Sequence, residues 1–196
     1  MLILGGARSG KSTFAERLAM SSKRQVAFIA TATGSDDEMR ERIARHRTAR
    51  PPEWQTLEET LDLAGAISRA SQQADVLLLD CLTLWLSNVL FQDIAVYDEG
   101  ELATVSRSAH MLVSERAMKG LNDCMHAIQS LGAEKTVIMV SNEVGMGIVP
   151  AYPLGRLYRD TLGYMNQRVA QTADRVYLLV AGIAVDIKRL QEEAVL

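Results

Sequence analysis

Short apolar runs alternate along the chain with longer stretches in which apolar residues recur at helical spacing. The runs are rich in valine, leucine and isoleucine and do not alternate with polar residues, which is typical of strands buried on both faces of a parallel sheet. A turn signal, Ala181-Gly182, separates the last two runs and predicts an antiparallel hairpin. The predicted strands span residues 2–5, 26–30, 76–80, 136–141, 176–180 and 183–187.

The stretches between these runs predict helices. Gly120 is a candidate break in the longest of them, and Pro51-Pro52 ends the second abruptly, because proline lacks an N–H and disfavours helical geometry in the residue before it. Strands that alternate with helices predict a mostly parallel sheet flanked by helices, so we expect one α/β domain over residues 1–196. The predicted helices span residues 11–20, 36–49, 61–72, 82–90, 101–131 and 156–173.

Composition narrows the class of protein. The 21 basic and 24 acidic residues give a net charge of −3, so no overall positive field draws nucleic acid to the surface. The two cysteines, Cys81 and Cys124, lie far apart without a metal-binding pattern, which favours buried thiols in a reducing compartment. No segment has the length and apolarity of a membrane span or a signal peptide. We therefore expect a cytoplasmic protein that neither binds nucleic acid nor inserts into membranes.

A glycine-rich turn lies directly between the first predicted strand and the first predicted helix. It fits the phosphate-loop pattern G-x-x-x-x-G-K-[ST], in which backbone N–H groups and a helix N-terminus surround a phosphate. Lys11 supplies a cation for the β and γ phosphates, and Ser12 is placed to hold Mg²⁺. The chain is therefore predicted to bind a nucleoside triphosphate. The turn reads Gly5-Gly6-Ala7-Arg8-Ser9-Gly10-Lys11-Ser12.

Asp80 ends the apolar strand over residues 76–80 and has two interpretations. It is a candidate cap for the helix that starts at Leu82. In phosphate-loop proteins a carboxylate at this place reaches Mg²⁺. Because parallel strands bring their carboxyl ends to one edge of a sheet, Asp80 and Lys11 are expected to face the same nucleotide, which favours the metal role.

The predicted second helix carries several arginines around one histidine, His46. The helix starts acidic and ends basic, as its dipole favours, so a solvated helix face is one interpretation. The other is that the arginines bind phosphates, and that their like charges keep His46 neutral and therefore nucleophilic. Composition leaves both open. Further along, Ser141, Asn142 and Glu143 lie where the strand over 136–141 gives way to a loop, and there they either touch substrate or only cap a turn.

Together these segments resemble the bifunctional adenosylcobinamide kinase and adenosylcobinamide-phosphate guanylyltransferase family of cobalamin biosynthesis. The resemblance runs in family order from near Met1 to about Lys188. Besides the phosphate loop, the matching segments are Ile29-Ala30-Thr31-Ala32, Asp36-Asp37-Glu38-Met39, Arg42-Ile43, His46, Arg50-Pro51, Trp54-Gln55-Thr56, Glu58, Asp80-Cys81-Leu82-Thr83, Asn142 to Pro150, Asn166-Gln167 and Ala173-Asp174.

The resemblance implies two reactions with Mg²⁺ and with ATP or GTP as co-substrates. The first phosphorylates adenosylcobinamide, and the second moves GMP from GTP onto adenosylcobinamide phosphate through a GMP-histidine, for which His46 is the matching residue. It also implies a RecA-like phosphate-loop fold and a homotrimer, and some members carry glutamate in place of Asp80. Beyond the phosphate loop, the implied nucleotide contacts are Ala30, Thr31, Ala32, Arg47, Thr48, Ala49, Arg50, Glu58 and Asp80.

Two other functions compete with this one. A plain phosphate-loop kinase would use the arginines on the γ phosphate and give His46 no covalent role. A non-catalytic GTP-dependent switch would bind nucleotide without turnover, although the chain has no N-K-x-D guanine signature.

Overall fold

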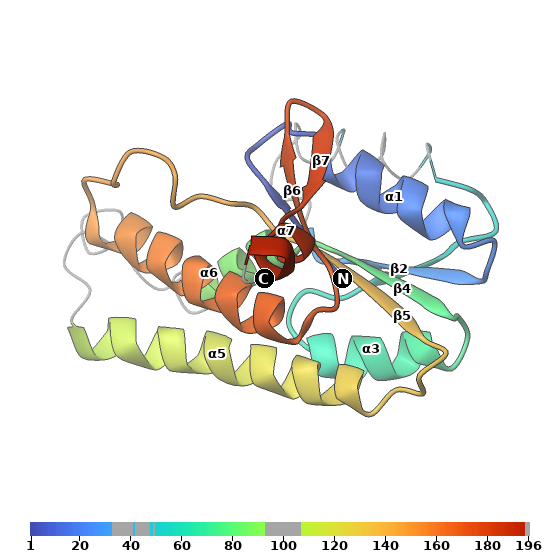
Figure 1. Cartoon of the computed structure of the whole chain (residues 1–196). Helices are drawn as coiled ribbons and strands as arrows, with labels where there is room; N and C mark the ends of the chain where they lie inside the picture. Colours follow the sequence, from blue (N-terminus) through green and yellow to red (C-terminus); the bar gives the residue numbers. More distant parts are fainter. Residues whose placement is uncertain (33–40, 42–47, 49, 93–106, 195–196) are drawn as a thin grey trace.

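The computed structural model describes residues 1–32, 41, 48, 50–92 and 107–194. At its centre is a seven-stranded sheet in the order β3-β2-β4-β5-β1-β6-β7 (Figure 1). Every neighbouring pair is parallel except β6 and β7, which form an antiparallel hairpin. The strands are β1 (Leu2–Gly5), β2 (Val26–Ala30), β3 (Gln55–Glu58), β4 (Val76–Asp80), β5 (Thr136–Val140), β6 (Val176–Val180) and β7 (Ile183–Asp186).

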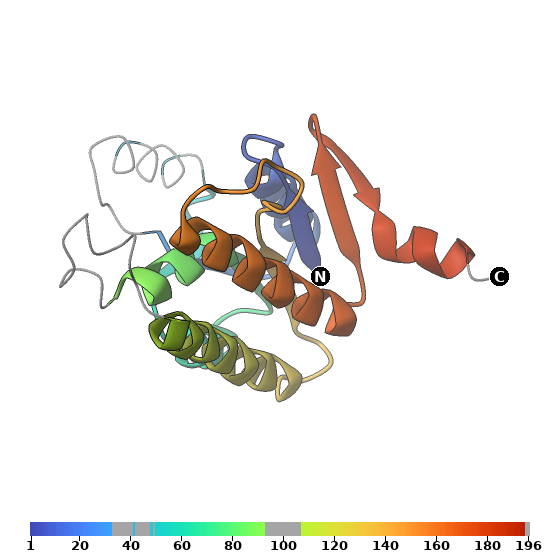
Figure 2. The same cartoon turned by 90° about the vertical axis from the view of Figure 1, so that its left-hand side faces the viewer.

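Helices cover both faces of the sheet. Helix α1 lies on one face, and α3, α4, α5 and α6 lie on the other (Figures 1 and 2). The β6–β7 hairpin and α7 lie at one side of the domain, and α7 projects away from the sheet and the other helices (Figure 2). The helices are α1 (Lys11–Ser21), α3 (Leu63–Ser71), α4 (Leu82–Phe91), α5 (Arg107–Gln129), α6 (Pro153–Thr172) and α7 (Ile187–Ala194).

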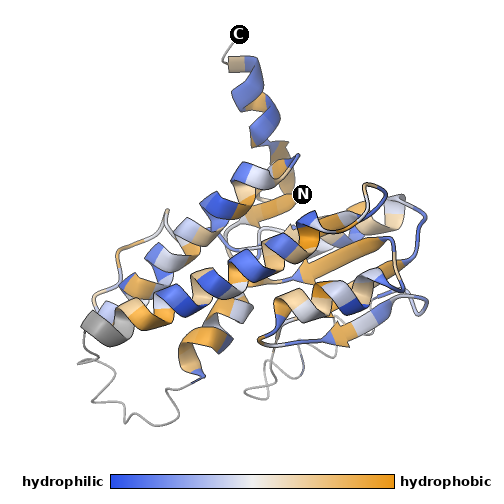
Figure 3. Cartoon of the chain, turned by 90° about the horizontal axis from the view of Figure 1, so that it is seen from below, coloured by the Kyte–Doolittle hydropathy of each residue, from blue (hydrophilic) through white to orange (hydrophobic). Residues whose placement is uncertain are grey.

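Successive residues of the central strands enter two separate cores. Ile3 and Val140 belong to the core under α1, whereas Leu2, Leu79 and Met139 belong to the core under α3 to α6. This follows from the alternation of side chains across a strand, and it explains why the strands are apolar at every position. Figure 3 shows these apolar strands beneath helices whose outer faces are hydrophilic.

The α/β class predicted from the sequence, with a mostly parallel sheet between helices and a C-terminal antiparallel hairpin, is confirmed. The six predicted strands are all present, but β3 and α7 were not predicted. The candidate break at Gly120 was wrong, because α5 runs through it. A Cβ atom at this position would lie 2.9 Å from Cζ2 of Trp85, so the glycine provides room for a ring. The helix predicted over residues 36–49 falls almost entirely outside the described residues.

Candidate nucleotide site

The phosphate loop lies between β1 and α1, at the carboxyl edge of the sheet. Gly10 is the N-cap of α1 and has a left-handed backbone with φ of 92°, and Arg8 has φ of 57°. Lys11 opens the helix, is only 7% exposed, and donates from Nζ to the Gly6 carbonyl at 2.6 Å. The predicted strand, turn and helix order is thus present, with the lysine ammonium folded over the loop where phosphates bind in this motif.

The C-terminal hairpin supports this loop from outside. The N–H of Gly182, in the turn between β6 and β7, donates to the Ser9 carbonyl at 3.1 Å. A Cβ atom on Gly10 would lie 3.5 Å from Cα of the same Gly182, so the two backbones are in contact. The Ser9 hydroxyl is buried and has no hydrogen-bond partner among the described residues, which makes it a group that a bound phosphate can satisfy.

Asp80 lies at the same edge, two strands away from the phosphate loop. It pairs in register with Ala30 on one side and with Val140 on the other, and Val140 pairs with Ile3 of β1. Within the described residues its carboxylate makes no hydrogen bond or ion pair, and the N-cap of α4 is Cys81, with no side-chain cap. The capping interpretation of Asp80 is therefore not what the structure contains, and its metal role stays a prediction.

Thr31 fixes the turn that follows Asp80. Its hydroxyl, fully buried, accepts from the Cys81 N–H at 2.8 Å and donates to the Cys81 carbonyl at 2.7 Å. Its own N–H donates to the Asp80 carbonyl at 3.2 Å, and its carbonyl accepts from Nδ2 of Asn88 at 2.8 Å. The N–H, carbonyl and hydroxyl of Thr31 all make hydrogen bonds within the protein. Its predicted contact with nucleotide would therefore be a van der Waals contact.

The thiol next to Asp80 is not a nucleophile at neutral pH. Burial, and then the negative charge of Asp80, raises the pKa of Cys81 to about 12. Burial likewise raises the pKa of Cys124 to about 12, and both cysteines are free.

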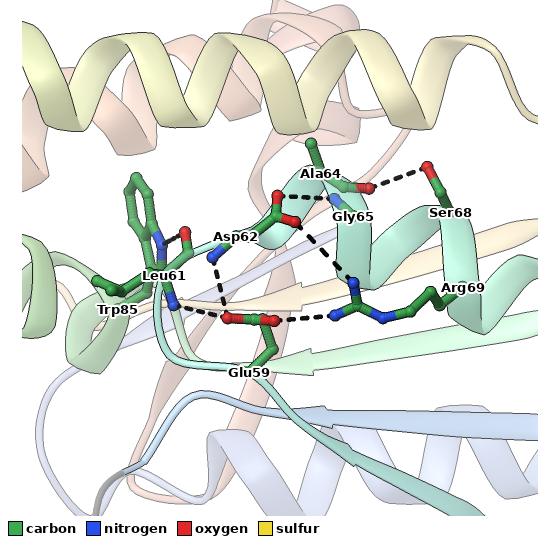
Figure 4. A network of polar contacts seen from close by, with 8 residues as sticks. All are labelled: Glu59, Leu61, Asp62, Ala64, Gly65, Ser68, Arg69 and Trp85. Carbon is green, nitrogen blue, oxygen red and sulfur yellow. Dashed lines mark hydrogen bonds and ion pairs between the residues drawn. The ribbon is translucent and has the colours of Figure 1, made fainter.

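Glu58 comes to this edge on β3, where it pairs in register with Ala30. The N–H of the next residue, Glu59, donates to the Ala30 carbonyl at 2.9 Å. Glu59 then accepts from the N–H groups of Leu61 and Asp62, each at 3.0 Å, and pairs with Arg69 of α3 at 2.8 Å (Figure 4). Although burial acts to raise it, these donors lower the pKa of Glu59 below its ordinary value. The network holds the link between β3 and α3, and with it the position of Glu58.

The remaining predicted residues are only partly described. The guanidinium carbon of Arg50 lies 3.3 Å from the centroid of the Phe28 ring, a cation–π contact with the middle of β2. Ala32 is half-buried just after β2, and Thr48 is exposed. His46, Arg47 and Ala49 lie outside the described residues.

Three residues at this edge had no role assigned from the sequence. Thr83 accepts at Oγ1 from the Asn142 N–H at 2.7 Å, and Asn166 donates from Nδ2 to the Asn142 carbonyl at 3.0 Å. Tyr158 donates to the Thr83 carbonyl at 3.0 Å, and burial raises the pKa of this tyrosine. Thr83 could have been found as a polar residue in an apolar helical stretch, whereas Asn166 and Tyr158 lie in a stretch of mixed polarity that carries no such signal.

The opposite edge of the sheet holds a cavity of about 140 Å³. Its walls include Met1, Lys135 and Asp174, which precede β1, β5 and β6, so it opens at the amino ends of the strands. Ligands of open parallel sheets bind outside the carboxyl ends, and the phosphate loop lies there too, so we place the site at that edge.

Among the described helices, none combines the length and apolarity that crossing a membrane requires.

Comparison with known proteins decides the family. The model of the family described as cobinamide kinase / cobinamide phosphate guanyltransferase matches residues 1–187. The chain belongs to this family. The family and the enzyme class predicted from the sequence are therefore confirmed, and the match ends at the start of α7.

Curated relatives agree with this family over nearly their whole length. The bifunctional adenosylcobalamin biosynthesis protein CobP of Pseudomonas aeruginosa is 42% identical over 187 residues, covering 95% of this chain and 96% of that protein. The bifunctional adenosylcobalamin biosynthesis protein CobU of Salmonella typhimurium is 41% identical over 189 residues, covering 96% of this chain and 99% of that one.

Solved structures resemble this chain at a much lower sequence identity than the curated relatives do. The RadB recombinase is 16% identical, with a TM-score of 0.42 over 90% of this chain and 72% of that chain. The type III secretion ATPase EscN is 13% identical, with a TM-score of 0.48 over 92% of this chain and 41% of that one. The fold assignment rests on the strand order and the phosphate loop.

Proposed function

We propose that this protein, as a single nucleotide-binding domain, phosphorylates adenosylcobinamide with ATP or GTP and then transfers GMP from GTP to adenosylcobinamide phosphate, releasing pyrophosphate. One observation carries the proposal. A phosphate loop with a buried Lys11 shares its sheet edge with Asp80 and Glu58, in a chain that matches the cobinamide kinase / cobinamide phosphate guanyltransferase family over residues 1–187.

The residues present suit Mg²⁺. This ion prefers oxygen ligands and keeps several waters, so it binds proteins through one or two groups together with nucleotide phosphates. Asp80 offers a carboxylate without a described partner, and Ser12 offers a hydroxyl in the first turn of α1. Mg²⁺ held here would neutralise charge on the phosphates. Lys11 would act beside it on the β and γ oxygens.

For the second reaction we propose that His46 is the nucleophile. Its ring nitrogen would attack the α phosphorus of GTP, the bond to the pyrophosphate oxygen would break, and a phosphoramidate would result. The phosphate of adenosylcobinamide phosphate would then displace the histidine. The family resemblance and the arginines around His46 in the sequence support this assignment. The plain kinase is the alternative, because it needs no covalent step.

The test is incubation with α-labelled GTP, followed by denaturation. The wild type should retain an acid-labile, alkali-stable label, and His46→Ala should lose both the label and guanylyl transfer while keeping part of the kinase activity. His126→Ala, which removes an exposed histidine of α5, is the matched control and should behave as the wild type. An unlabelled wild type that still makes adenosylcobinamide phosphate would favour the plain kinase. Nucleotide binding without any cobinamide turnover would favour the switch.

We further propose that the protein works as a homotrimer in the cytoplasm. Apolar side chains on the hairpin and α7 support self-association, since Ile183 is 69% exposed and Val180 is 62% exposed. Two free, buried cysteines suit a reducing compartment. Light scattering after size exclusion should give three times the chain mass, and Ile183→Asp should shift it to the monomer. A monomeric wild type at micromolar concentration would contradict the trimer.

A further inference from the structure

Asn142 lies two residues after the end of β5, at the carboxyl edge of the sheet where the candidate site is. Strand β5 lies between β4, which carries Asp80, and β1, which leads into the phosphate loop. Asn142 comes just after β5, and the N–H of the next residue, Glu143, donates to the Gly5 carbonyl at 2.9 Å. Asn142 is thus held at the sheet edge between the start of the phosphate loop and the carboxylate strand.

Two helices hold the backbone of Asn142 from both sides. Its N–H is bound by Thr83 of α4 and its carbonyl by Asn166 of α6, at 2.7 and 3.0 Å. Both partners are 6% exposed, and burying a polar side chain is unfavourable unless it is hydrogen-bonded. Two buried side chains therefore act on a single peptide segment, which fixes where the Asn142 side chain starts.

The side chain of Asn142 has no hydrogen-bond partner in the part of the chain that the structure describes. Among the described residues the amide of Asn142 makes no hydrogen bond, although the residue is half-buried. The neighbouring Glu143 differs, because its carboxylate accepts from the N–H of Gly145 at 2.5 Å. An amide carries two donors and one acceptor, so Asn142 keeps hydrogen-bonding capacity at the place where the nucleotide phosphates are expected.

We propose that the side-chain NH₂ of Asn142 donates a hydrogen bond to the γ-phosphoryl group of the bound triphosphate and strengthens this bond in the transition state. The proposal rests on the proposed kinase function for its catalytic part. In that step the substrate hydroxyl oxygen bonds to the γ phosphorus, the bond from phosphorus to the bridging oxygen breaks, and the hydroxyl proton is released to the medium. The amide gives and takes no proton, so its contribution is a fixed dipole aimed at developing charge.

The test compares nucleotides that differ only in the γ phosphate. Affinities for GDP and for guanylyl imidodiphosphate are measured with Mg²⁺ for the wild type, Asn142→Ala and Asn142→Asp, each in a His46→Ala background so that no GMP-histidine forms from the analogue. We expect Asn142→Ala to bind GDP within about twofold of wild type and to lose roughly tenfold to a hundredfold for the triphosphate analogue, as one hydrogen bond to a charged group implies. Asn142→Asp should lose more than Ala, although it is isosteric, because its carboxylate repels phosphate. Kinase kcat should fall by about 10²-fold in Asn142→Ala.

Two further variants separate this role from a structural one. Asn122→Asp makes the same chemical change on α5 and should match the wild type in both affinities. Asn166→Ala removes the support of the backbone and should lower the melting temperature and both affinities together. The same parallel loss of GDP and triphosphate affinity in Asn142→Ala would overturn the proposal, as would an unchanged preference for triphosphate. The affinities are measured without cobinamide. They therefore test the proposed hydrogen bond even if the wild type has no kinase activity.

Discussion

Gly5 passes so close to Leu179 of β6 that a Cβ atom on Gly5 would lie 2.6 Å from the Leu179 carbonyl oxygen. The same atom would also lie 2.6 Å from the hydroxyl oxygen of Ser9. The phosphate loop therefore leaves the sheet through a gap that only glycine fits.

Gly5→Ala should consequently displace the loop. We expect a loss of about 1–3 kcal/mol in the free energy of unfolding, from overpacking against backbone, and at least a tenfold loss of nucleotide affinity, measured by urea unfolding and by titration calorimetry. Gly6→Ala is the control for stability, since a Cβ atom there would have no atom within 4 Å. Equal stability of the two variants would show that the strand relaxes at no cost.

Asp80→Asn tests the metal role. The carboxylate has no described partner, so its replacement should change the free energy of unfolding by less than about 0.5 kcal/mol. Turnover should instead fall by roughly tenfold to a hundredfold and need more Mg²⁺ for half-maximal rate, because a charge that orders the metal is lost. Asp123→Asn on α5, an exposed ion-pair partner of Lys119, is the control. Identical Mg²⁺ titrations for wild type and Asp80→Asn would remove Asp80 from the metal site.

Glu59 should give the protein a stability that depends on acid pH. A carboxyl whose pKa is lowered on folding stabilises the native state above its unfolded pKa, near 4.5, and this contribution is lost as the pH falls through the lower folded value. Glu59→Gln should therefore cost about 1 kcal/mol at pH 7, since Arg69 is half-exposed and screened, and less as the pH drops below about 4.

Urea unfolding at pH 7 and at acid pH measures this difference directly. Glu53→Gln, at an exposed position, controls for the loss of one carboxyl group. A cost for Glu59→Gln that stays constant across this range would mean that the amide replaces the carboxylate in the network of Figure 4.

Two glycines inside helices should respond to alanine with opposite signs. Gly163 of α6 has open space around it, so Gly163→Ala should stabilise the protein by about 0.5–1 kcal/mol through helix propensity. Gly120→Ala on α5 would meet the buried Trp85 ring and should destabilise by about 1–3 kcal/mol. Thermal unfolding of the two variants side by side gives the comparison. Stabilisation in both would show that the Trp85 ring can move.

The parts of the fold that could be predicted from sequence are those in which local pattern and burial agree. The central strands are apolar at every position because both faces are covered, and their predicted limits differ from the observed ones by a residue at most. Strand β3, Gln55–Glu58, was missed because it is a polar edge strand that a single partner, β2, holds in place. Gly120 was also misjudged because its role depends on a tertiary contact, with the Trp85 ring of α4.

The site divides in the same way. The phosphate loop and Asp80 were predicted because each is recognised from contiguous residues. The loop lies between an apolar run and a helical stretch, and Asp80 ends an apolar run. Thr83 and Asn166 form hydrogen bonds to the backbone of Asn142 only when α4 and α6 are packed together. The local sequence pattern does not predict this tertiary contact. Thr31 was predicted as a nucleotide contact, a role that stays a prediction, while its polar groups serve the turn after Asp80.

The burial of Trp85 supplies an optical probe of the whole fold. Its ring is 1% exposed between α4 and α5, and its indole N–H donates to the Leu61 carbonyl at 2.8 Å. Its emission in the native protein should be blue-shifted and insensitive to iodide, and it should move to the red when the helices separate. The other tryptophan, Trp54, is half-buried against the core that contains Phe28, just before the start of β3. A Trp85→Phe variant would leave Trp54 as the only indole, so its fluorescence would then report on the core under α1 alone.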